Sequence, residues 1–321
     1  MDRDKILALI DVAEGRGLEI GALMNPILDK RSSRVEYVDR ASTEELRRWY
    51  AINDKVDPTK LVEVDHVWGS QTLFECVGGR RIYDYVVASH VIEHVPDLFG
   101  WLTEIASVLA DDGIASFVVP DKRYTFDVLR RTSSESELVD AYVRGLRRPD
   151  PRQIFDHFTG FRDVDGVQLR NGLSADAIPS PHDQKHLLDL CRHTIASGDY
   201  IDAHCWVFTP RTFVAALDLG SRLDILPFEI AAVSPTPDHA HEFFVSLRRL
   251  PEDRTPDQRR AAFVASRDAV ALPSEDAPSE VEELRRRLAH AERQISALRG
   301  STSWRITEPL RRAVTLLRRG G

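Results

Sequence analysis

Two acidic residues stand at the ends of two short apolar runs near the start of the chain. Glu19 lies in the run 17–20, directly before Gly21, and Asp39 closes the run 35–38. In a doubly wound parallel sheet, a nucleotide-like ligand lies across the carboxyl ends of the strands, where a carboxylate holds its ribose hydroxyls. The spacing therefore predicts a cofactor site in which Glu19, Gly21 and Asp39 contact a nucleotide-like ligand.

The turn after the first run restricts the kind of ligand. Residues 21–26 contain a single glycine, Gly21, whereas a dinucleotide site uses three glycines to bring the pyrophosphate against a helix N-terminus. A ligand with a ribose but no pyrophosphate fits this turn better, and S-adenosylmethionine (SAM) is such a ligand. A nicotinamide-dependent sugar dehydrogenase would also place Asp39 on a ribose, but the Gly-x-Gly-x-x-Gly turn is absent.

A third segment carries a family resemblance. Residues 84–97 read Asp-Tyr-Val-Val-Ala-Ser-His-Val-Ile-Glu-His-Val-Pro-Asp, which is typical of a buried strand, a polar turn and a helix start. With the helix expected over 98–110 and the strand over 114–119, the segment resembles the fourth and fifth strand units of class I SAM-dependent methyltransferases. The resemblance spans residues 15–122 and returns at 242–250.

This resemblance implies a fold, a cofactor and site residues. The implied fold is α/β, a doubly wound, mostly parallel seven-stranded Rossmann-like sheet, and the implied cofactor is SAM. Ser89, His90 and His94 would line or support the cofactor pocket. Asp65, which we place at the carboxyl end of a third strand over 61–67, would approach the adenine amine, with a solvated loop aspartate as the alternative.

Histidines are the candidates for handling a proton. Methyl transfer to a hydroxyl requires an aligned acceptor and the removal of one proton, for which a group with a near-neutral pKa is suited. His157, in the segment 155–158, and His204, in the segment 202–206, each combine an acidic neighbour with aromatic residues. We predict His204 as the catalytic base and His157 as the second candidate; a hydrogen-bonded structural histidine is the alternative for either.

The sequence predicts no metal site. His182 and His186 are four residues apart and could share a helical face, but no glutamate follows the first histidine as in the metalloprotease pattern. The three cysteines, Cys76, Cys191 and Cys205, share no metal-ligand spacing. Their odd number indicates a reducing compartment without a disulfide framework.

Composition limits the partners and the location. The chain has 321 residues and a net charge of −8, which argues against nucleic acid as a partner. Its acidic first residues do not resemble a signal peptide, and no apolar run is long enough to span a bilayer. We therefore expect a cytoplasmic protein that contacts the inner face of the plasma membrane only peripherally.

The chain divides into four regions. A SAM-binding methyltransferase domain is expected over 1–250, with a helical, substrate-covering insertion at about 121–200, where the strand–helix alternation stops. A linker rich in Pro, Asp, Arg and Ala follows over 251–279. A short coiled coil over 280–299 and a basic amphipathic tail over 300–321 complete the chain.

The predicted coiled coil rests on apolar residues that recur at alternating steps of three and four. They are Val281, Leu284, Leu288, Ala291, Ile295 and Leu298. This is the seam of a coiled coil, so the segment predicts a homo-oligomer or a glycosyltransferase partner. A lone amphipathic helix lying on the body is the alternative.

The tail carries a second resemblance. Residues 301–312, Ser-Thr-Ser-Trp-Arg-Ile-Thr-Glu-Pro-Leu-Arg-Arg, resemble the endings that follow coiled coils in bacterial glycosyltransferases and other proteins of cell-surface polysaccharide assembly. The mixture of arginine with large apolar residues suits an anionic membrane surface or an acidic partner. A solvated helix end is the alternative.

Together the two resemblances give one hypothesis and one rival. The hypothesis is a SAM-dependent methyltransferase that methylates a sugar hydroxyl in a bacterial surface polysaccharide or its lipid-linked precursor, the acceptor being inferred by analogy. The rival is a non-catalytic, methyltransferase-like scaffold that recruits glycan-assembly enzymes to the membrane. The single glycine of the first turn, Gly21, is the feature that favours the rival.

Overall fold

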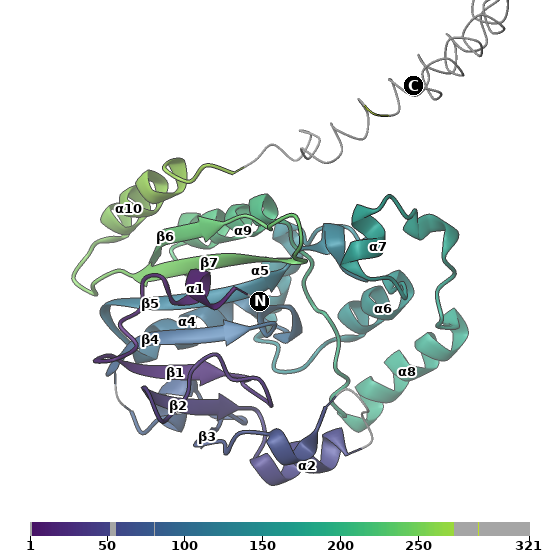
Figure 1. The fold of residues 1–321 in the computed structure, drawn as a ribbon, viewed down its shortest axis with the longest axis horizontal. Helices are drawn as coiled ribbons and strands as arrows, with labels where there is room; N and C mark the ends of the chain where they lie inside the picture. Colours follow the sequence, from purple (N-terminus) through teal and green to yellow (C-terminus); the bar gives the residue numbers. More distant parts are fainter. Residues whose placement is uncertain (1, 52–55, 80, 273–287, 289–321) are drawn as a thin grey trace, which may run out of the picture. The chain divides into compact units, whose positions relative to one another are not determined.

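A seven-stranded sheet organises the chain (Figure 1). The computed structural model describes residues 2–51, 56–79, 81–272 and 288. The strands are β1 (Arg16–Ile20), β2 (Arg34–Asp39), β3 (His66–Val67), β4 (Tyr83–Ser89), β5 (Leu109–Pro120), β6 (Phe228–Ser234) and β7 (Glu242–Arg249). Their order in the sheet is β3-β2-β1-β4-β5-β7-β6, and β7 alone is antiparallel to its neighbours β5 and β6. The predicted Rossmann-like, mostly parallel sheet is confirmed.

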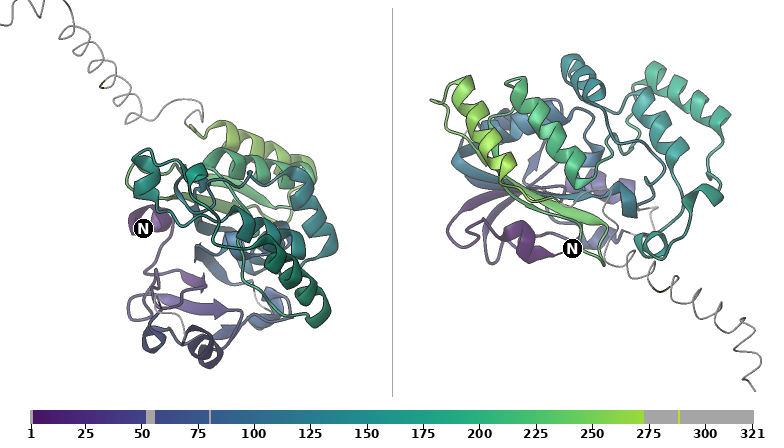
Figure 2. Two further views of the ribbon diagram at one scale, coloured as in Figure 1. Left: turned by 90° about the vertical axis from the view of Figure 1, so that its right-hand side faces the viewer. Right: turned by 90° about the horizontal axis from the view of Figure 1, so that it is seen from above.

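Helices cover both faces of the sheet (Figure 2). The α-helices are α1 (Arg3–Leu7), α2 (Thr43–Tyr50), α3 (Leu73–Cys76), α4 (Leu98–Val108), α5 (Glu135–Arg144), α6 (Pro151–Gly160), α7 (Gly166–Arg170), α8 (Gln184–Ser197), α9 (Pro210–Arg222) and α10 (Pro256–Asp268). Four short 3₁₀ helices are η1 (Pro58–Lys60), η2 (Ile92–His94), η3 (Lys122–Tyr124) and η4 (Ala175–Ala177).

Side chains of the central strand β4 lie in two hydrophobic cores. Successive side chains of a strand point to opposite faces, so Val86 joins the core under α4 and α9, while Tyr85 joins the core under α1. Both side chains are almost completely buried. The near-continuous apolar run of β4 is therefore the signature of a strand covered on both faces.

The segment after β1 forms turns rather than the helix that usually follows the first strand of a doubly wound sheet. Residues 21–33 contain no helix. Instead, Glu19, only 2% exposed, accepts the backbone N–H groups of Ile27 at 2.6 Å and Leu28 at 2.9 Å. The buried carboxylate takes the place of helical hydrogen bonds, and the side chains of Ile27 and Leu28 pack into the core under α1.

The third strand is shorter than predicted. The sequence indicated a strand over 61–67, but β3 contains only His66 and Val67. The preceding residues have other partners: Leu61 packs in a small separate cluster, and the N–H of Val62 donates to the carbonyl of Leu23. Those local bonds remove the residues from the edge of the sheet.

The predicted insertion over 121–200 is helical. It contains α5 to α8, and α6 and α8 pack around Ile154 and Cys191 in a core of their own. Figure 1 shows α6, α7 and α8 beyond the carboxyl ends of the strands. The insertion therefore lies on the side of the sheet where parallel α/β proteins bind their ligands.

The compact body continues past the predicted boundary at residue 250. Helix α10 lies within the predicted linker, yet Phe263 is buried and the N–H of Ile230 donates to the hydroxyl of Ser266 at 3.0 Å. The body therefore extends to residue 272, because α10 buries an apolar side chain on β6 and α9.

Apart from residue 288, the predicted coiled coil and basic tail lie outside the described residues. Among the described helices, none has the length and hydropathy required to cross a bilayer.

Replacing Glu19 with alanine should destabilise the protein. The N–H groups of Ile27 and Leu28 would lose their acceptor in a buried site, which costs about 1–3 kcal/mol for each group. We expect the free energy of unfolding, measured by denaturant titration, to fall by about 2–5 kcal/mol. The exposed Glu14→Ala is the matched control and should change it by less than about 0.5 kcal/mol. Equal effects of the two substitutions would contradict the assignment.

The same pair of proteins should show a pH dependence. Burial raises the pKa of Glu19 to about 7 from 4.5. A carboxyl whose pKa is raised on folding contributes stability below its unfolded pKa and loses it as the pH rises through the folded value. The difference in unfolding free energy between wild type and Glu19→Ala should therefore be larger at pH 5 than at pH 8.

Candidate active site

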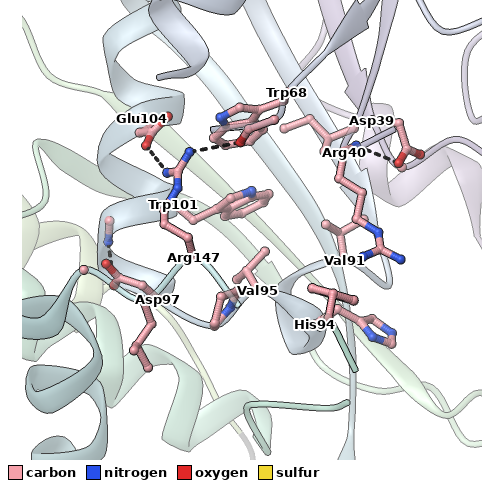
Figure 3. A pocket seen from close by; sticks show the side chains of 18 residues that line it. Asp39, Arg40, Trp68, Val91, His94, Val95, Asp97, Trp101, Glu104 and Arg147 are labelled. Carbon is pink, nitrogen blue, oxygen red and sulfur yellow. Dashed lines mark hydrogen bonds and ion pairs between the residues drawn. The ribbon is translucent and has the colours of Figure 1, made fainter. Parts of the chain in front are cut away.

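A pocket of about 340 Å³ opens at the carboxyl ends of β1, β2 and β4 (Figure 3). Its walls are formed by Ile20, Gly21, Asp39, Arg40, Trp68, Gly69, Val91, His94, Val95, Pro96, Asp97, Gly100, Trp101, Glu104, Gly145, Leu146, Arg147 and Tyr200. The walls are mostly apolar, with few polar groups, which is typical of a small-molecule site. Two of the predicted cofactor contacts from the first two strands, Gly21 and Asp39, belong to it.

Asp39 supplies the carboxylate of this pocket. It is the last residue of β2, and its Oδ1 accepts the backbone N–H of Arg40 at 2.7 Å. Burial raises the pKa of Asp39 to about 6. The group is therefore ionised at neutral pH and has acceptor capacity for a pair of ligand hydroxyls.

Gly21 is required by the backbone at the end of β1. Its φ is +71°, a conformation that L-residues with a side chain rarely adopt. A Cβ added there would stand 2.7 Å from Cγ2 of Val91, a residue that follows β4. One glycine is thus enough to let the first turn approach β4 closely, because the segment that follows is a loop rather than a helix.

Two tryptophans form the other side of the pocket. Figure 3 shows the indoles of Trp68 and Trp101 across the pocket from Asp39. Arg147 lies beside them, donating to Glu104 at 2.7 Å and to the carbonyl of Gly69 at 3.3 Å. Among the described residues, Nε1 of Trp68 is buried without a hydrogen-bond partner, so the ring rather than its N–H lines the pocket.

Two predicted cofactor contacts have other partners. Glu19 does not line the pocket, since it holds the loop after β1. Asp65 precedes β3 instead of ending it; its carboxylate accepts the N–H of Tyr37 at 2.6 Å and pairs with Lys30 at 2.7 Å. The residue that follows β3 at its carboxyl end is Trp68. Sequence reasoning missed Trp68 because it assigned the ligand contact to Asp65, which lies inside the predicted strand, although the predicted and observed strands both end at Val67.

His90 and Ser89 lie at the end of β4 but not in the pocket wall. Nε2 of His90 stands 2.7 Å from Glu242, and Nδ1 stands 3.4 Å from Glu93. Burial opposes protonation, but the hydrogen bonds to these two carboxylates raise the pKa of His90 to about 10. His90 is partly exposed, and through these two carboxylates it joins the turn after β4 to the start of β7.

His94 connects the pocket to a second group of residues. It lines the pocket, and its Nδ1 stands 3.0 Å from Asp202. Burial lowers and the Asp202 hydrogen bond raises its pKa, with a net rise. Its ring meets that of His204 edge-on, with the centroids 4.7 Å apart. The segment directly after the insertion, which carries Asp202 and His204, is thus in direct contact with the wall of the pocket.

His204 forms a buried pair with Asp127. Its Nδ1 is 2.5 Å from Oδ2 of Asp127, whose other oxygen accepts from Arg130 at 2.8 Å. Burial opposes ionisation of Asp127, but the hydrogen bond from His204 and the charge of Arg130 lower its pKa to about 2. A fixed carboxylate on Nδ1 orients the imidazole and leaves Nε2 for chemistry.

His157 lies beside His204, where it contacts the backbone rather than the imidazole of His204 through a hydrogen bond. Its Nδ1 accepts the backbone N–H of His204 at 3.2 Å, and the two rings lie 5.4 Å apart. Burial lowers the pKa of His157 to about 3, so the ring is neutral and suited to accept that bond. The geometry makes His157 a residue that positions the backbone at His204.

Sequence reasoning missed two members of this cluster, Asp127 and Glu93. Asp127 lies in the segment 121–130 after β5, which has no helical or strand period to mark it. Glu93, only 2% exposed, was seen only as part of a family motif. Its backbone carbonyl accepts the N–H of Cys205 at 2.5 Å, which fixes the turn after β4 against the segment that carries His204.

The fold and the pocket define a doubly wound α/β protein with a nucleoside-sized site at its strand ends. Residues 4–218 match a protein family described as "Methyltransferase domain". The match covers more than half of the chain, so the chain belongs to this methyltransferase family. A search of curated proteins finds no match.

Solved structures with a similar arrangement include several with low identity. An S-adenosylmethionine-dependent methyltransferase from Mesorhizobium loti is 14% identical, with 77% of this chain and 98% of that chain covered and a TM-score of 0.37. One from Listeria monocytogenes is 12% identical, with 78% and 95% covered and a TM-score of 0.38. A Rhodobacter sphaeroides protein described as a Zn-dependent alcohol dehydrogenase is 16% identical, with 77% and 88% covered and a TM-score of 0.42. Likeness at these levels supports no conclusion about activity.

As a methyltransferase of this fold, the chain uses SAM as its cofactor, as predicted. The pocket fits such a ligand: Asp39 would hold the ribose hydroxyls, and Trp68 and Trp101 offer flat apolar faces to the adenine. SAM supplies an electrophilic methyl group when bound.

Replacing Asp39 with asparagine should weaken SAM binding about 10- to 100-fold, because hydrogen bonds to a charged acceptor are lost. For wild type, the affinity measured by calorimetry should fall as the pH drops through about 6, where the carboxylate becomes protonated. The variant should show no such fall. Asp65→Asn is the matched control and should keep the Kd within about twofold, since Asp65 lies outside the pocket. A large loss of affinity in the control would contradict the placement.

Proposed function

We propose that this chain transfers the methyl group of SAM to a hydroxyl oxygen of a sugar, in a bacterial surface polysaccharide or its lipid-linked precursor. One observation carries the reaction type. His94 lines the cofactor pocket and contacts His204, so a buried histidine–carboxylate cluster adjoins the pocket directly. A hydroxyl acceptor must lose a proton on methylation, and a cluster of this kind is suited to that task.

Different residues of the chain bind the cofactor, exclude water and act on the acceptor proton. The pocket walls bind and orient the cofactor, and the insertion helices beyond the strand ends limit the access of water. His204 is the residue that acts on the acceptor hydroxyl, through Nε2, while Asp127 holds Nδ1 and His157 holds the backbone. The proposal keeps both predicted catalytic histidines, with His204 acting and His157 positioning.

The acceptor class rests on the tail sequence. Residues 301–312 resemble the ends of polysaccharide-assembly proteins, and their arginines and large apolar residues suit an anionic membrane surface. We propose that the heptad over 280–299 mediates self-association or binding of a glycosyltransferase. The chain would then act in the cytoplasm, at the inner face of the plasma membrane.

His204→Gln should lower the rate of methyl transfer about 10²- to 10⁴-fold, because it removes the group that acts on the acceptor proton. Asp127→Asn should lower it less. The measurement is incorporation of radiolabelled methyl from SAM into the host's polysaccharide extract. The Kd of SAM should remain unchanged in both variants, since neither residue lines the pocket.

The matched control is His193→Gln. His193 makes the same kind of pair, 2.8 Å from Asp199, but both side chains are exposed on α8 and the segment that follows it. An equal rate for His204→Gln and His193→Gln would contradict the assignment. If the wild-type protein binds SAM yet incorporates no label, the scaffold alternative is favoured. Deletion of 281–321 should then abolish function, whereas an enzyme without that segment should still methylate a soluble acceptor.

A further inference from the structure

We propose that Glu93, His94 and His204 bind one divalent transition-metal ion of the Zn²⁺ class beside the cofactor pocket. Among the described residues, one potential ligand atom from each of the three lies within 4.8 Å of the other two. Two imidazoles and one carboxylate are a ligand set that catalytic zinc sites use, with a further position left for water or substrate. No such site was predicted from the sequence.

The first support is an unpaired buried carboxylate oxygen. Glu93 is 2% exposed, and within the described part of the chain its Oε2 has no hydrogen-bond partner. A buried polar atom of this kind is costly unless an unseen water or ion satisfies it. Because a carboxylate oxygen of Glu93 lies within 4.8 Å of a ring nitrogen of His94 and of His204, a cation bound among the three residues would satisfy the unpaired oxygen.

The second support is the orientation of each ligand. Nδ1 of His94 pairs with Asp202, Nδ1 of His204 pairs with Asp127, and Glu93 stands 3.4 Å from His90 through its other oxygen. Metal-binding histidines almost always give their second ring nitrogen to a carboxylate or carbonyl in this way. Both Nε2 atoms and Oε2 of Glu93 are therefore the atoms left to hold the ion.

The three ligand atoms would have to move only slightly to bind one ion. Ligand atoms around a tetrahedral zinc, each about 2.1 Å from the metal, stand about 3.4 Å apart. The present separations of up to 4.8 Å need side-chain movements of about 1.4 Å at most. The backbone that carries the ligands is already fixed by the bond from the Cys205 N–H to the carbonyl of Glu93.

Two other groups of potential ligands are less suitable. In the group of Asp127, His157 and His204, hydrogen bonds between the members use the facing atoms, and Arg130 places a cation against Asp127. In the group of His90, His241 and Glu242, the 2.7 Å bond between His90 and Glu242 already pairs the two. Only the first group contains an unsatisfied buried atom.

The role of the ion rests on the proposed function. His94 belongs to the pocket wall, so an ion bound to it would lie beside the cofactor pocket, where an open position could take the acceptor hydroxyl. A hydroxyl bound there has a lowered pKa; its bonding electrons stay on oxygen, and its proton passes to water. His204 would then act on the acceptor by holding the ion rather than as a free base.

The test is a Co²⁺ titration of the full chain after dialysis against a chelator, followed by visible absorption. We expect one equivalent of Co²⁺ to give ligand-field bands that Zn²⁺ abolishes by displacement. Glu93→Gln should remove the bands. Asp202→Asn, which changes only an exposed orienting carboxylate, should weaken Co²⁺ affinity about 10- to 100-fold. Thermal unfolding of each chelated variant shows whether it is folded.

His193→Gln is the control and should bind Co²⁺ as the wild type does, because its histidine–aspartate pair lies outside the cluster. Absence of the bands in the folded wild-type protein, or equal binding by Glu93→Gln and wild type, would overturn the proposal and return His204 to the role of general base. The titration contains neither SAM nor acceptor, so its result is independent of the proposed methyl transfer.

Discussion

The hydrogen bond from the N–H of Cys205 to the carbonyl of Glu93 joins the two parts of the site. It fixes the turn after β4 against the strand-like segment at the end of the insertion. The indole N–H of Trp206 strengthens the same junction by donating to the carbonyl of Val95 at 2.6 Å. With the junction in place, His204 meets His94 at the wall of the pocket. Without it, the cofactor pocket and the histidine cluster would be separate features.

The site is divided between an apolar half and a charged half. The apolar half, with Trp68 and Trp101 opposite Asp39, is built by loops at the ends of β2, β3 and β4 and by α4. The charged half, around His204 and Asp127, is built largely by the insertion and sits in a buried environment. Burial strengthens the electrostatic interactions there, which is why its carboxylates and imidazoles are paired so closely.

Local sequence predicted the framework well. The apolar runs that end at Asp39 and Ser89 became β2 and β4. Prediction failed where tertiary bonds replaced local ones. Glu19 looked like a cofactor contact because it follows an apolar residue at a strand end, but its oxygens are used by the loop of residues 27–28. Likewise, β3 begins only at His66, so Asp65 lies before the strand and bonds to Tyr37 and Lys30, and Trp68, directly after the strand, lines the pocket.

The sequence by itself determined the class of fold and the position of Asp39 and of the segment 89–94 at strand ends, because strand periodicity and strand-end residues are local properties. Only the tertiary structure decided which histidines lie together. His94, Asp127 and His204 are separated by long stretches of chain, and their meeting depends on how the insertion folds back over the strand ends. The periodicity of apolar residues carries no information about how the insertion folds back over the strand ends, because that path is set by packing between elements rather than within them.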